Sequence, residues 1–330
     1  MTTSVEEYDL IIVGGGPIGL TCAIEAKKQG VSYVILEKGT LVDSLYHFPT
    51  NMSFFSTSSL LEIGNVPFIS HSDKPTRREA LEYFRRVQEA WELNIHFYEE
   101  VTDIDKKQDY FSVSTTRQKY ISSYVIVATG FYGQPKLMNV PGEQLPKVHH
   151  YYKEAHPYIS QKVLIVGAAN SACDVALELF HKGSEVTMVI RGDQINPRVK
   201  YWIRPNIENR IKEGSIQAYF NSQILRIEED SVIIQTPEGE KVIPNDYVLA
   251  MTGYIPDYPF LDKIGIARDP EDAGRPDVNR ETLESNIDNL YLAGVIVAGS
   301  KTSTLFIENS RIHAQIIVQQ IKEKEKVLQG

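Results

Sequence analysis

The chain has 330 residues, of which 42% are hydrophobic and 23% are charged, values that suit a globular protein of about two domains. Its net charge of −9 argues against nucleic acid as the main partner, because a basic face would then be expected. No apolar run approaches the roughly 20 residues of a membrane-spanning helix, and the acidic N-terminus lacks the features of a signal peptide. We therefore expect a soluble cytoplasmic protein with no membrane partner.

The first predicted unit is a strand over residues 9–13, a glycine-rich turn over 14–19 (GGGPIG) and a helix over 17–29. At such a junction, backbone N–H groups and the positive end of the helix dipole can hold a pyrophosphate. The following strand, residues 32–37, ends at Glu37, whose carboxylate would accept hydrogen bonds from a ribose diol and repel a 2′-phosphate. This unit therefore predicts an FAD site. The alternative for Glu37 is an ordinary charge at a strand end.

An amphipathic helix is predicted after a long non-repetitive stretch that reaches about Pro75. Thr76 is expected to cap this helix together with Glu79, and its charged side chains, Arg77 among them, are expected to form a solvated face. The predicted apolar face consists of Leu81, Phe84, Val87 and Trp91. Strands are then expected near residues 95–98, 101–105, 110–116, 119–121 and 124–128.

A second nucleotide turn lies at residues 167–172 (GAANSA), between a strand over 163–166 and a helix over 171–182. The next strand, residues 186–190, ends at Arg191, with Lys200 close behind, and cations there suit the 2′-phosphate of NADPH. The alternatives are that Arg191 is a surface arginine and that this turn, which has Ala169 in place of its second glycine, survives only as a scaffold. Later strands are expected near 216–219, 223–229, 231–236 and 241–243.

Two similar segments, residues 128–130 (ATG) and 251–253 (MTG), indicate where the chain leaves one domain and returns to it. They predict an α/β fold with two Rossmann-like dinucleotide-binding domains: an NADPH domain over 131–252, inserted in a discontinuous FAD domain over 1–130 and 253–330. We expect a further strand over 288–294, a last helix over 303–322 and a frayed tail from Lys322. The core candidates on the last helix are Ile307, Ile312, Ile316 and Ile317.

Several less generic segments make the chain resemble the YpdA-type bacillithiol disulfide reductases, within the flavoproteins of the low-molecular-weight thioredoxin reductase type. They are residues 14–17 (GGGP), 49–50 (PT), 54–56 (FFS), 65–69 (NVPFI), 128–134 (ATGFYGQ), 145–148 (LPKV), 150–151 (HY), 154–158 (EAHPY), 253–258 (GYIPDY) and 306–309 (FIEN). The resemblance spans nearly the whole chain. It implies a homo-oligomeric, FAD-containing, NADPH-dependent reductase whose substrate is the disulfide of a low-molecular-weight thiol.

The cofactor-binding candidates combine the two turns with positions carried over from this resemblance. For FAD they are Gly14, Gly16, Pro17, Gly19, Glu37, Lys38, Val101, Thr129, Gly130, Gly294 and Val295. For NADPH they are Gly167, Ala169, Asn170, Ser171, Arg191 and Lys200. Thioredoxin reductases carry an aspartate at the position of Val295, so the ribitol contact of that aspartate must come from elsewhere in this chain.

The chain departs from the family at its thiols. Ile18 stands where the family has a cysteine, and the stretch from 145 to 158 holds no C-x-x-C. The two cysteines, Cys22 and Cys173, are expected to be buried core residues, and neither a disulfide nor a metal site is predicted. The electron acceptor is therefore open between a small disulfide and a carrier such as ferredoxin, flavodoxin or a quinone.

The sequence leaves two further functions and the identity of the catalytic residues open. A flavin monooxygenase is disfavoured because the F-x-G-x-x-x-H motif of that family is missing, and a flavin-bound redox sensor that no longer turns over is the remaining alternative. No catalytic residue is assigned. His149, His150 and His156 either supply protons or pack at a linker. Glu308 and Asn309 either face the flavin or cap the last helix.

Overall fold

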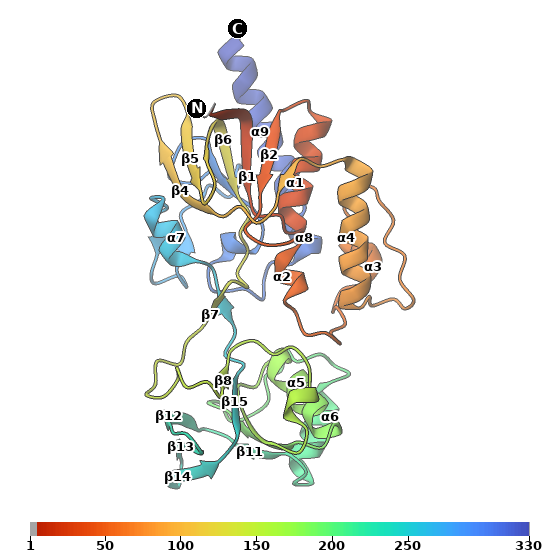
Figure 1. Ribbon diagram of the computed structural model, residues 1–330, viewed down its shortest axis with the longest axis vertical. Helices are drawn as coiled ribbons and strands as arrows, with labels where there is room; N and C mark the ends of the chain where they lie inside the picture. The colour runs from red at the N-terminus through yellow and green to blue at the C-terminus, as the bar shows by residue number, and fades with distance from the viewer. Residues whose placement is uncertain (1–4, 330) are drawn as a thin grey trace. The chain divides into compact units, whose positions relative to one another are not determined.

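The computed structural model describes residues 5–329, and the chain forms two compact units (Figure 1). The first unit contains the chain up to Gln134 and again from Tyr254, and the second runs from Pro135 to Gly253. The chain thus leaves the first unit once and returns once, within a few residues of Gly130 and Gly253. The short strands β7 (Gln134–Pro135) and β16 (Tyr254–Ile255) lie at these two passages and pair with each other.

A seven-stranded sheet forms the centre of the first unit, in the order β3-β2-β1-β6-β5-β4, with β19 also beside β6. β1 is parallel to β2 and β6, whereas β4, β5 and β6 form an antiparallel meander. The strands are β1 (Glu6–Val13), β2 (Tyr33–Leu36), β3 (Ile95–His96), β4 (Val101–Lys106), β5 (Phe111–Thr115), β6 (Lys119–Val127) and β19 (Leu290–Leu292). Residues 10–13 of β1 are all buried because both faces of the sheet are covered, which explains their continuous apolar run.

The helices of the first unit include the predicted amphipathic one. Its capping box is confirmed: the Thr76 side chain accepts the Glu79 N–H, and the Glu79 carboxylate accepts the Thr76 N–H at 2.7 Å. Arg77 is not simply solvated, since its Nε donates to the Leu45 carbonyl oxygen at 3.1 Å. The helices are α1 (Pro17–Lys28), α2 (Asp43–Tyr46), α3 (Ser58–Leu61), α4 (Arg77–Trp91), α7 (Tyr258–Lys263), the 3₁₀ turn η2 (Val295–Ala298), α8 (Ile307–Ser310) and α9 (Ile312–Gln329), with a small hairpin of β17 (Arg268–Asp269) and β18 (Arg275–Pro276).

The C-terminal region differs from the sequence prediction. Two helices, α8 and α9, replace the single expected helix, and α9 continues to Gln329, so the predicted frayed tail was wrong. Lys322 pairs with Glu325 one turn later, at 2.6 Å, and this spacing supports the helix. Ile312 was wrongly expected in the core: it is 48% exposed, whereas Ile317 is buried.

The second unit is built on a parallel five-stranded sheet with both faces covered. Val163 and Ile165 of β9 belong to one core with residues of α5, whereas Leu164 and Val166 belong to another with residues of β12 and β13. The sheet order is β11-β10-β9-β15-β8, and β12, β13 and β14 form a separate antiparallel sheet. The elements are β8 (Val148–His149), η1 (His156–Tyr158), β9 (Lys162–Val166), α5 (Asn170–His181), β10 (Glu185–Val189), α6 (Arg204–Lys212), β11 (Gln217–Tyr219), β12 (Gln223–Ile227), β13 (Ser231–Thr236), β14 (Gly239–Pro244) and β15 (Tyr247–Ala250).

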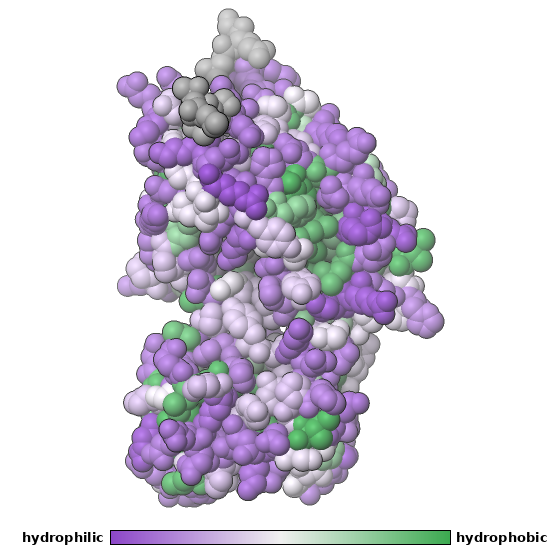
Figure 2. All heavy atoms as spheres, viewed as in Figure 1, coloured by the Kyte–Doolittle hydropathy of each residue, from purple (hydrophilic) through white to green (hydrophobic). Residues whose placement is uncertain are grey.

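The described residues include no helix that is long and apolar enough to cross a membrane. On the visible face of each unit, hydrophilic residues cover most of the surface, with apolar patches among them, the largest on the first unit (Figure 2). Within residues 5–329, no group of three or more His, Cys, Asp or Glu is placed to hold a metal ion.

Candidate functional site

The first glycine turn has a backbone geometry that requires glycine at two of its positions. Gly14 has φ +107°, and a Cβ there would lie 2.8 Å from the Ala128 carbonyl oxygen. A Cβ at Gly19 would lie 1.9 Å from the Gly14 carbonyl oxygen, so α1 and β1 approach closely only with glycine at this position. At Gly16, by contrast, a Cβ would meet no atom within 4 Å, and no side chain caps the start of α1 there. The first N–H groups of α1 are therefore not capped by a side chain, and a helix N-terminus of this kind can bind a phosphate.

The Glu37 carboxylate is held beside this turn at the end of β2. The side chain is 5% exposed; its Oε2 accepts the Gly15 N–H at 2.5 Å and its Oε1 accepts the Gly39 N–H at 2.7 Å. Burial raises the pKa of the carboxyl, and the two N–H groups oppose that shift. Because each carboxylate oxygen has a second lone pair, Glu37 can still accept hydrogen bonds from a ribose diol.

Thr129 marks the carboxyl end of β6 next to the turn. Its Oγ1 is buried and has no hydrogen-bond partner among the described residues, and its Cα would lie 3.4 Å from a Cβ at Gly14. Leaving a buried hydroxyl unpaired costs free energy, and Thr129 lies beside the glycine turn, so its hydroxyl is a candidate partner for a polar ligand bound there. Gly130, at φ +71°, has open space around its Cβ position. The turn, Glu37 and Thr129 together fit the dinucleotide that the sequence predicts.

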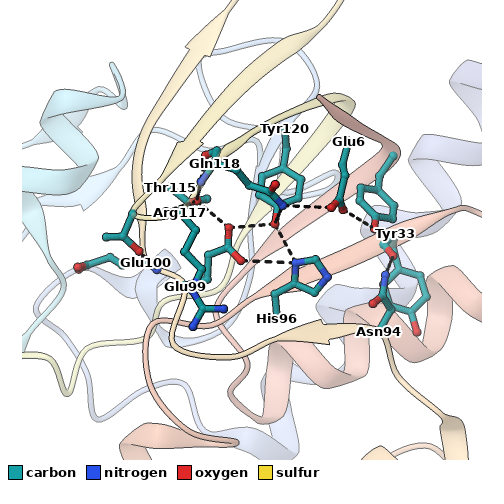
Figure 3. A network of polar contacts seen from close by, with 12 residues as sticks. Glu6, Tyr33, Asn94, His96, Glu99, Glu100, Thr115, Arg117, Gln118 and Tyr120 are labelled. Carbon is teal, nitrogen blue, oxygen red and sulfur yellow. Dashed lines mark hydrogen bonds and ion pairs between the residues drawn. The ribbon is translucent and has the colours of Figure 1, made fainter. Parts of the chain in front are cut away.

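Glu99 lies at the centre of a buried polar network (Figure 3). Glu99, 2% exposed, accepts hydrogen bonds from Tyr120 Oη at 2.9 Å and Thr115 Oγ1 at 2.7 Å, and His96 Nδ1 lies 3.5 Å away. The Glu99 N–H donates to the Glu37 carbonyl oxygen at 2.9 Å, so the network is coupled to the backbone of the candidate ribose-binding residue. We did not identify Glu99 from the sequence. A carboxylate between two short strands has no pattern that distinguishes it from a surface charge.

Gly294 follows β19, precedes η2 and lies beside the first glycine turn. It has φ +85°, and a Cβ there would lie 3.2 Å from Ile18 Cγ1. Its N–H donates to His313 Nδ1 at 3.1 Å. His313 is buried, and burial lowers the pKa of its imidazole. Ile18, at the family's cysteine position, thus lies beside the segment that begins Gly294-Val295. Of the remaining FAD candidates, Val101 is buried at the start of β4 and Lys38 is exposed.

The second turn keeps the same backbone shape. Gly167 has φ +130°, and a Cβ there would lie 2.6 Å from the Met251 carbonyl oxygen. Ala169 is the N-cap of α5 and provides no side-chain cap, and Ala169 and Ser171 are both exposed. The first N–H groups of α5 are therefore not capped by the N-cap side chain, as at the first turn.

The candidate cations of the second turn differ in their surroundings. Lys200 Nζ pairs with Asp174 at 2.9 Å, and the Lys200 side chain is 12% exposed. The Lys200 N–H donates to Asn170 Oδ1 at 2.9 Å. Arg191, in contrast, is exposed at the end of β10. Lys200 thus joins its loop to α5, whereas Arg191 is the cation that faces solvent.

Neither cysteine is placed for thiol chemistry. Cys22 and Cys173 are fully buried in helices, and burial raises the pKa of each thiol to about 12. A thiol with such a pKa contains almost no thiolate at neutral pH and is a poor nucleophile. This matches the expectation that both are core residues.

The three histidines before β9 differ in their surroundings: His149 packs on an aromatic ring, His150 lies near a carboxylate, and His156 is exposed. His149 stacks on Tyr247 with ring centroids 5.9 Å apart, and burial lowers its pKa. His150 Nε2 lies 3.6 Å from Glu143 Oε1, while His156 is exposed.

The structure distinguishes the two polar residues of α8. Asn309 caps the helix, because the Phe306 N–H donates to its Oδ1 at 2.6 Å. Glu308 does not cap it. Glu308 Oε1 instead accepts a hydrogen bond from Ser56 Oγ at 2.6 Å, across 252 positions of the chain.

Residues 11–294 match the protein family described as pyridine nucleotide-disulphide oxidoreductase. The chain belongs to this family. It is therefore an oxidoreductase that uses a flavin and a pyridine nucleotide, as the two turns predict.

Two relatives are similar over almost the full chain. Bacilliredoxin reductase Bdr of Bacillus subtilis (strain 168) is 44% identical over 317 residues, covering 96% of this chain and 98% of its own. The structure of bacillithiol disulfide reductase Bdr (YpdA) from Staphylococcus aureus superimposes with a TM-score of 0.94 at 44% identity, over 97% of this chain and 99% of its own. These matches confirm the predicted resemblance to the YpdA-type proteins.

A third match concerns the fold alone. Thioredoxin reductase from T. acidophilum shares 20% identity and a TM-score of 0.75, over 97% of this chain and 99% of its own. The predicted α/β fold with two Rossmann-like units of the thioredoxin reductase type is confirmed.

Proposed function

We propose that the protein binds FAD in the first unit and NADPH in the second, and reduces the disulfide of a low-molecular-weight thiol of the bacillithiol type. The observation that supports this most is the 44% identity over 96% of the chain to a relative named bacilliredoxin reductase. A structural neighbour at the same identity is named for bacillithiol disulfide. The balanced reaction is NADPH + H⁺ + RSSR → NADP⁺ + 2 RSH.

In this proposal the first unit holds FAD through its backbone. Gly14, Gly16 and Gly19 allow the pyrophosphate to reach the N-terminus of α1, and Glu37 accepts hydrogen bonds from the adenosine ribose. Thr129 Oγ1 gains a polar partner. The flavin, when bound, supplies the hydride-transfer chemistry, and the protein sets access and orientation.

The second unit holds NADPH in the same manner. Gly167 and the uncapped start of α5 receive the pyrophosphate, with Asn170 and Ser171 beside it. Arg191 pairs with the 2′-phosphate, because it is the exposed cation at the end of β10. Lys200 organises the loop through Asp174 and thereby assists binding indirectly.

A second candidate function is an NADPH-dependent reductase of a redox carrier. The burial of Cys22 and Cys173 favours it, because neither thiol is available for a mixed disulfide with a substrate. In both candidates electrons leave the flavin directly, without a protein thiolate. A cytoplasmic location and a homo-oligomeric state remain predictions from the sequence.

An anaerobic reoxidation experiment separates the two candidates. The purified yellow protein is reduced with one equivalent of NADPH, and bacillithiol disulfide is then added while the flavin absorbance is followed. Rapid return of the oxidised spectrum with release of two thiols supports the disulfide reductase. A flavin that stays reduced until a one-electron acceptor is added contradicts it and supports the carrier reductase.

A further inference from the structure

Glu308 carries a polar atom for which the fold provides no partner. Its Oε1 accepts the Ser56 hydroxyl at 2.6 Å, whereas its Oε2 is buried and has no hydrogen-bond partner in the described part of the chain. Capping of α8 does not explain this carboxylate, since Asn309 performs that task. A buried carboxylate oxygen without a donor is costly, so the feature calls for a ligand group.

The carboxylate is held in a fixed position. Ser56 links α8 to the segment before α3, and Arg311 Nη1 donates to the Glu62 carbonyl oxygen at 2.5 Å just after α3. Helix α8 also contacts α3 directly. Glu308 and Arg311 thus each bond to the segment around α3, and these two links restrain the Glu308 carboxylate independently of the helix cap.

The position of α8 relates Oε2 to the candidate flavin site. Helix α8 contacts α1, whose first turn is the glycine turn, and Figure 1 shows it beside that end of α1. The parallel strands of the sheet end at the same edge, which is where ligands bind in such folds. Thr129 Oγ1, the other unpaired buried oxygen described above, lies at this edge as well.

We propose that Glu308 Oε2 accepts a hydrogen bond from a donor on the flavin half of bound FAD. The donors available there are the imide N–H of the ring and the hydroxyls of the ribityl chain. The side chain of Val295 has no polar atom with which to meet them, and in this proposal the Glu308 side chain supplies an acceptor from α8. This inference rests on the proposed function, because it assumes that the first unit binds FAD.

The test measures FAD binding to the apoprotein by quenching of flavin fluorescence. Glu308→Leu removes the acceptor and is expected to raise the Kd about 10- to 100-fold, as for the loss of a hydrogen bond to a charged group. Ser56→Ala removes the hydrogen bond that positions the carboxylate but keeps the acceptor, so it should raise the Kd by less than Glu308→Leu does. Glu82→Gln, on the exposed face of α4, is the surface control.

Glu308→Gln keeps the shape of the side chain in case the leucine variant does not fold. Removing a negative charge near the flavin is expected to raise the reduction potential of the bound flavin, whereas a carboxylate with a purely structural role would leave it unchanged. The wild-type protein provides a further readout with two ligand analogues. One analogue is FAD methylated at the ring imide, and the other is FAD lacking a ribityl hydroxyl. The analogue that lacks the true donor should have a higher Kd for wild type than FAD has. The increase should equal the increase in the Kd of FAD caused by Glu308→Leu.

The analogue that binds wild type more weakly than FAD does identifies the donor. The same analogue should bind Glu308→Leu as tightly as FAD binds that variant. Unchanged FAD affinity in Glu308→Leu, or an unchanged reduction potential in Glu308→Gln, would overturn the inference. Those results leave the proposed function standing if wild type binds FAD and is reduced by NADPH. Failure of wild type to bind FAD would instead refute the proposed function.

Discussion

His313 accepts a hydrogen bond from the backbone N–H of Gly294 through Nδ1, at 3.1 Å. An imidazole nitrogen that accepts cannot carry a proton, so the ring is neutral with its hydrogen on Nε2. The bond restrains the turn at Gly294, which lies against Ile18 of the first glycine turn. In a charged His313, Nδ1 would carry a hydrogen that points at the Gly294 N–H. The hydrogen bond would be lost, and the turn would no longer be restrained by it.

This contact predicts a stability loss in acid. Burial lowers the folded-state pKa of His313 below its ordinary value of 6.5, so between those two values the unfolded chain binds more protons than the folded one. Stability is therefore full above about pH 6.5 and falls as the pH decreases through that value. Urea unfolding of His313→Asn should show a smaller decrease over this range, although His149 contributes a decrease of the same sign.

The control for this prediction is His156→Asn, because His156 is exposed. Its pH profile should match that of wild type. Identical profiles for wild type and His313→Asn would show that His313 does not contribute to the acid sensitivity.

We expect a substitution of Thr129 to weaken FAD binding without lowering the stability of the apoprotein. Thr129→Val removes a buried hydroxyl that has no partner among the described residues, so the free energy of unfolding of the apoprotein should stay the same or rise. FAD affinity should fall about 2- to 10-fold, as for one neutral hydrogen bond. Ser122→Ala is a matched control, since Ser122 Oγ is also buried and unpartnered on β6. Weaker FAD binding in the serine variant as well would argue against a specific contact at Thr129.

Arg191 predicts the choice of nucleotide. Arg191→Gln should raise the KM for NADPH about 10- to 100-fold and leave the KM for NADH unchanged, because NADH has no 2′-phosphate. The steady-state kinetics are compared with Lys212→Gln, an exposed charge change on α6. Equal losses with both nucleotides would indicate a role other than phosphate recognition.

The buried cysteines predict turnover without protein thiols. A Cys22→Ala, Cys173→Ala variant should keep its NADPH-dependent turnover within about twofold, while its stability falls by about 1 kcal/mol per site from the lost packing. Stopped-flow reduction and reoxidation of the flavin provide the measurement. Normal reduction by NADPH together with abolished reoxidation by the acceptor would mean that one thiol takes part after all.

The parts of the fold that the sequence predicts correctly are those with a local physical cause. The run before Gly14 shows a buried strand because every residue is apolar, and Thr76 with Glu79 shows a helix start because both capping bonds are made within four residues. The break between α8 and α9 has no such local signal. Ser310 and Arg311 can continue a helix, and the Arg311 contact to the Glu62 carbonyl oxygen depends on a segment far away in sequence.

The same reason explains the features of the candidate site that were missed. Glu99 acquires its importance from Thr115 and Tyr120, which reach it only after β4, β5 and β6 form the meander. Lys200 was grouped with Arg191 because both are cations after the second turn, yet its pairing with Asp174 is a tertiary contact. Motif reasoning finds the backbone turns that bind phosphate, and long-range side-chain partners decide which charges remain available for ligand.

The first unit and the second unit have separate hydrophobic cores: one cluster serves the first, and two clusters on opposite faces of one sheet serve the second. Each unit is thus a cooperative element whose melting can be followed by its own ligand. In a calorimetric scan, FAD would shift one heat-absorption peak upward and NADP⁺ the other, in proportion to the logarithm of ligand concentration. A single midpoint temperature would then conceal which half of the chain a substitution had weakened.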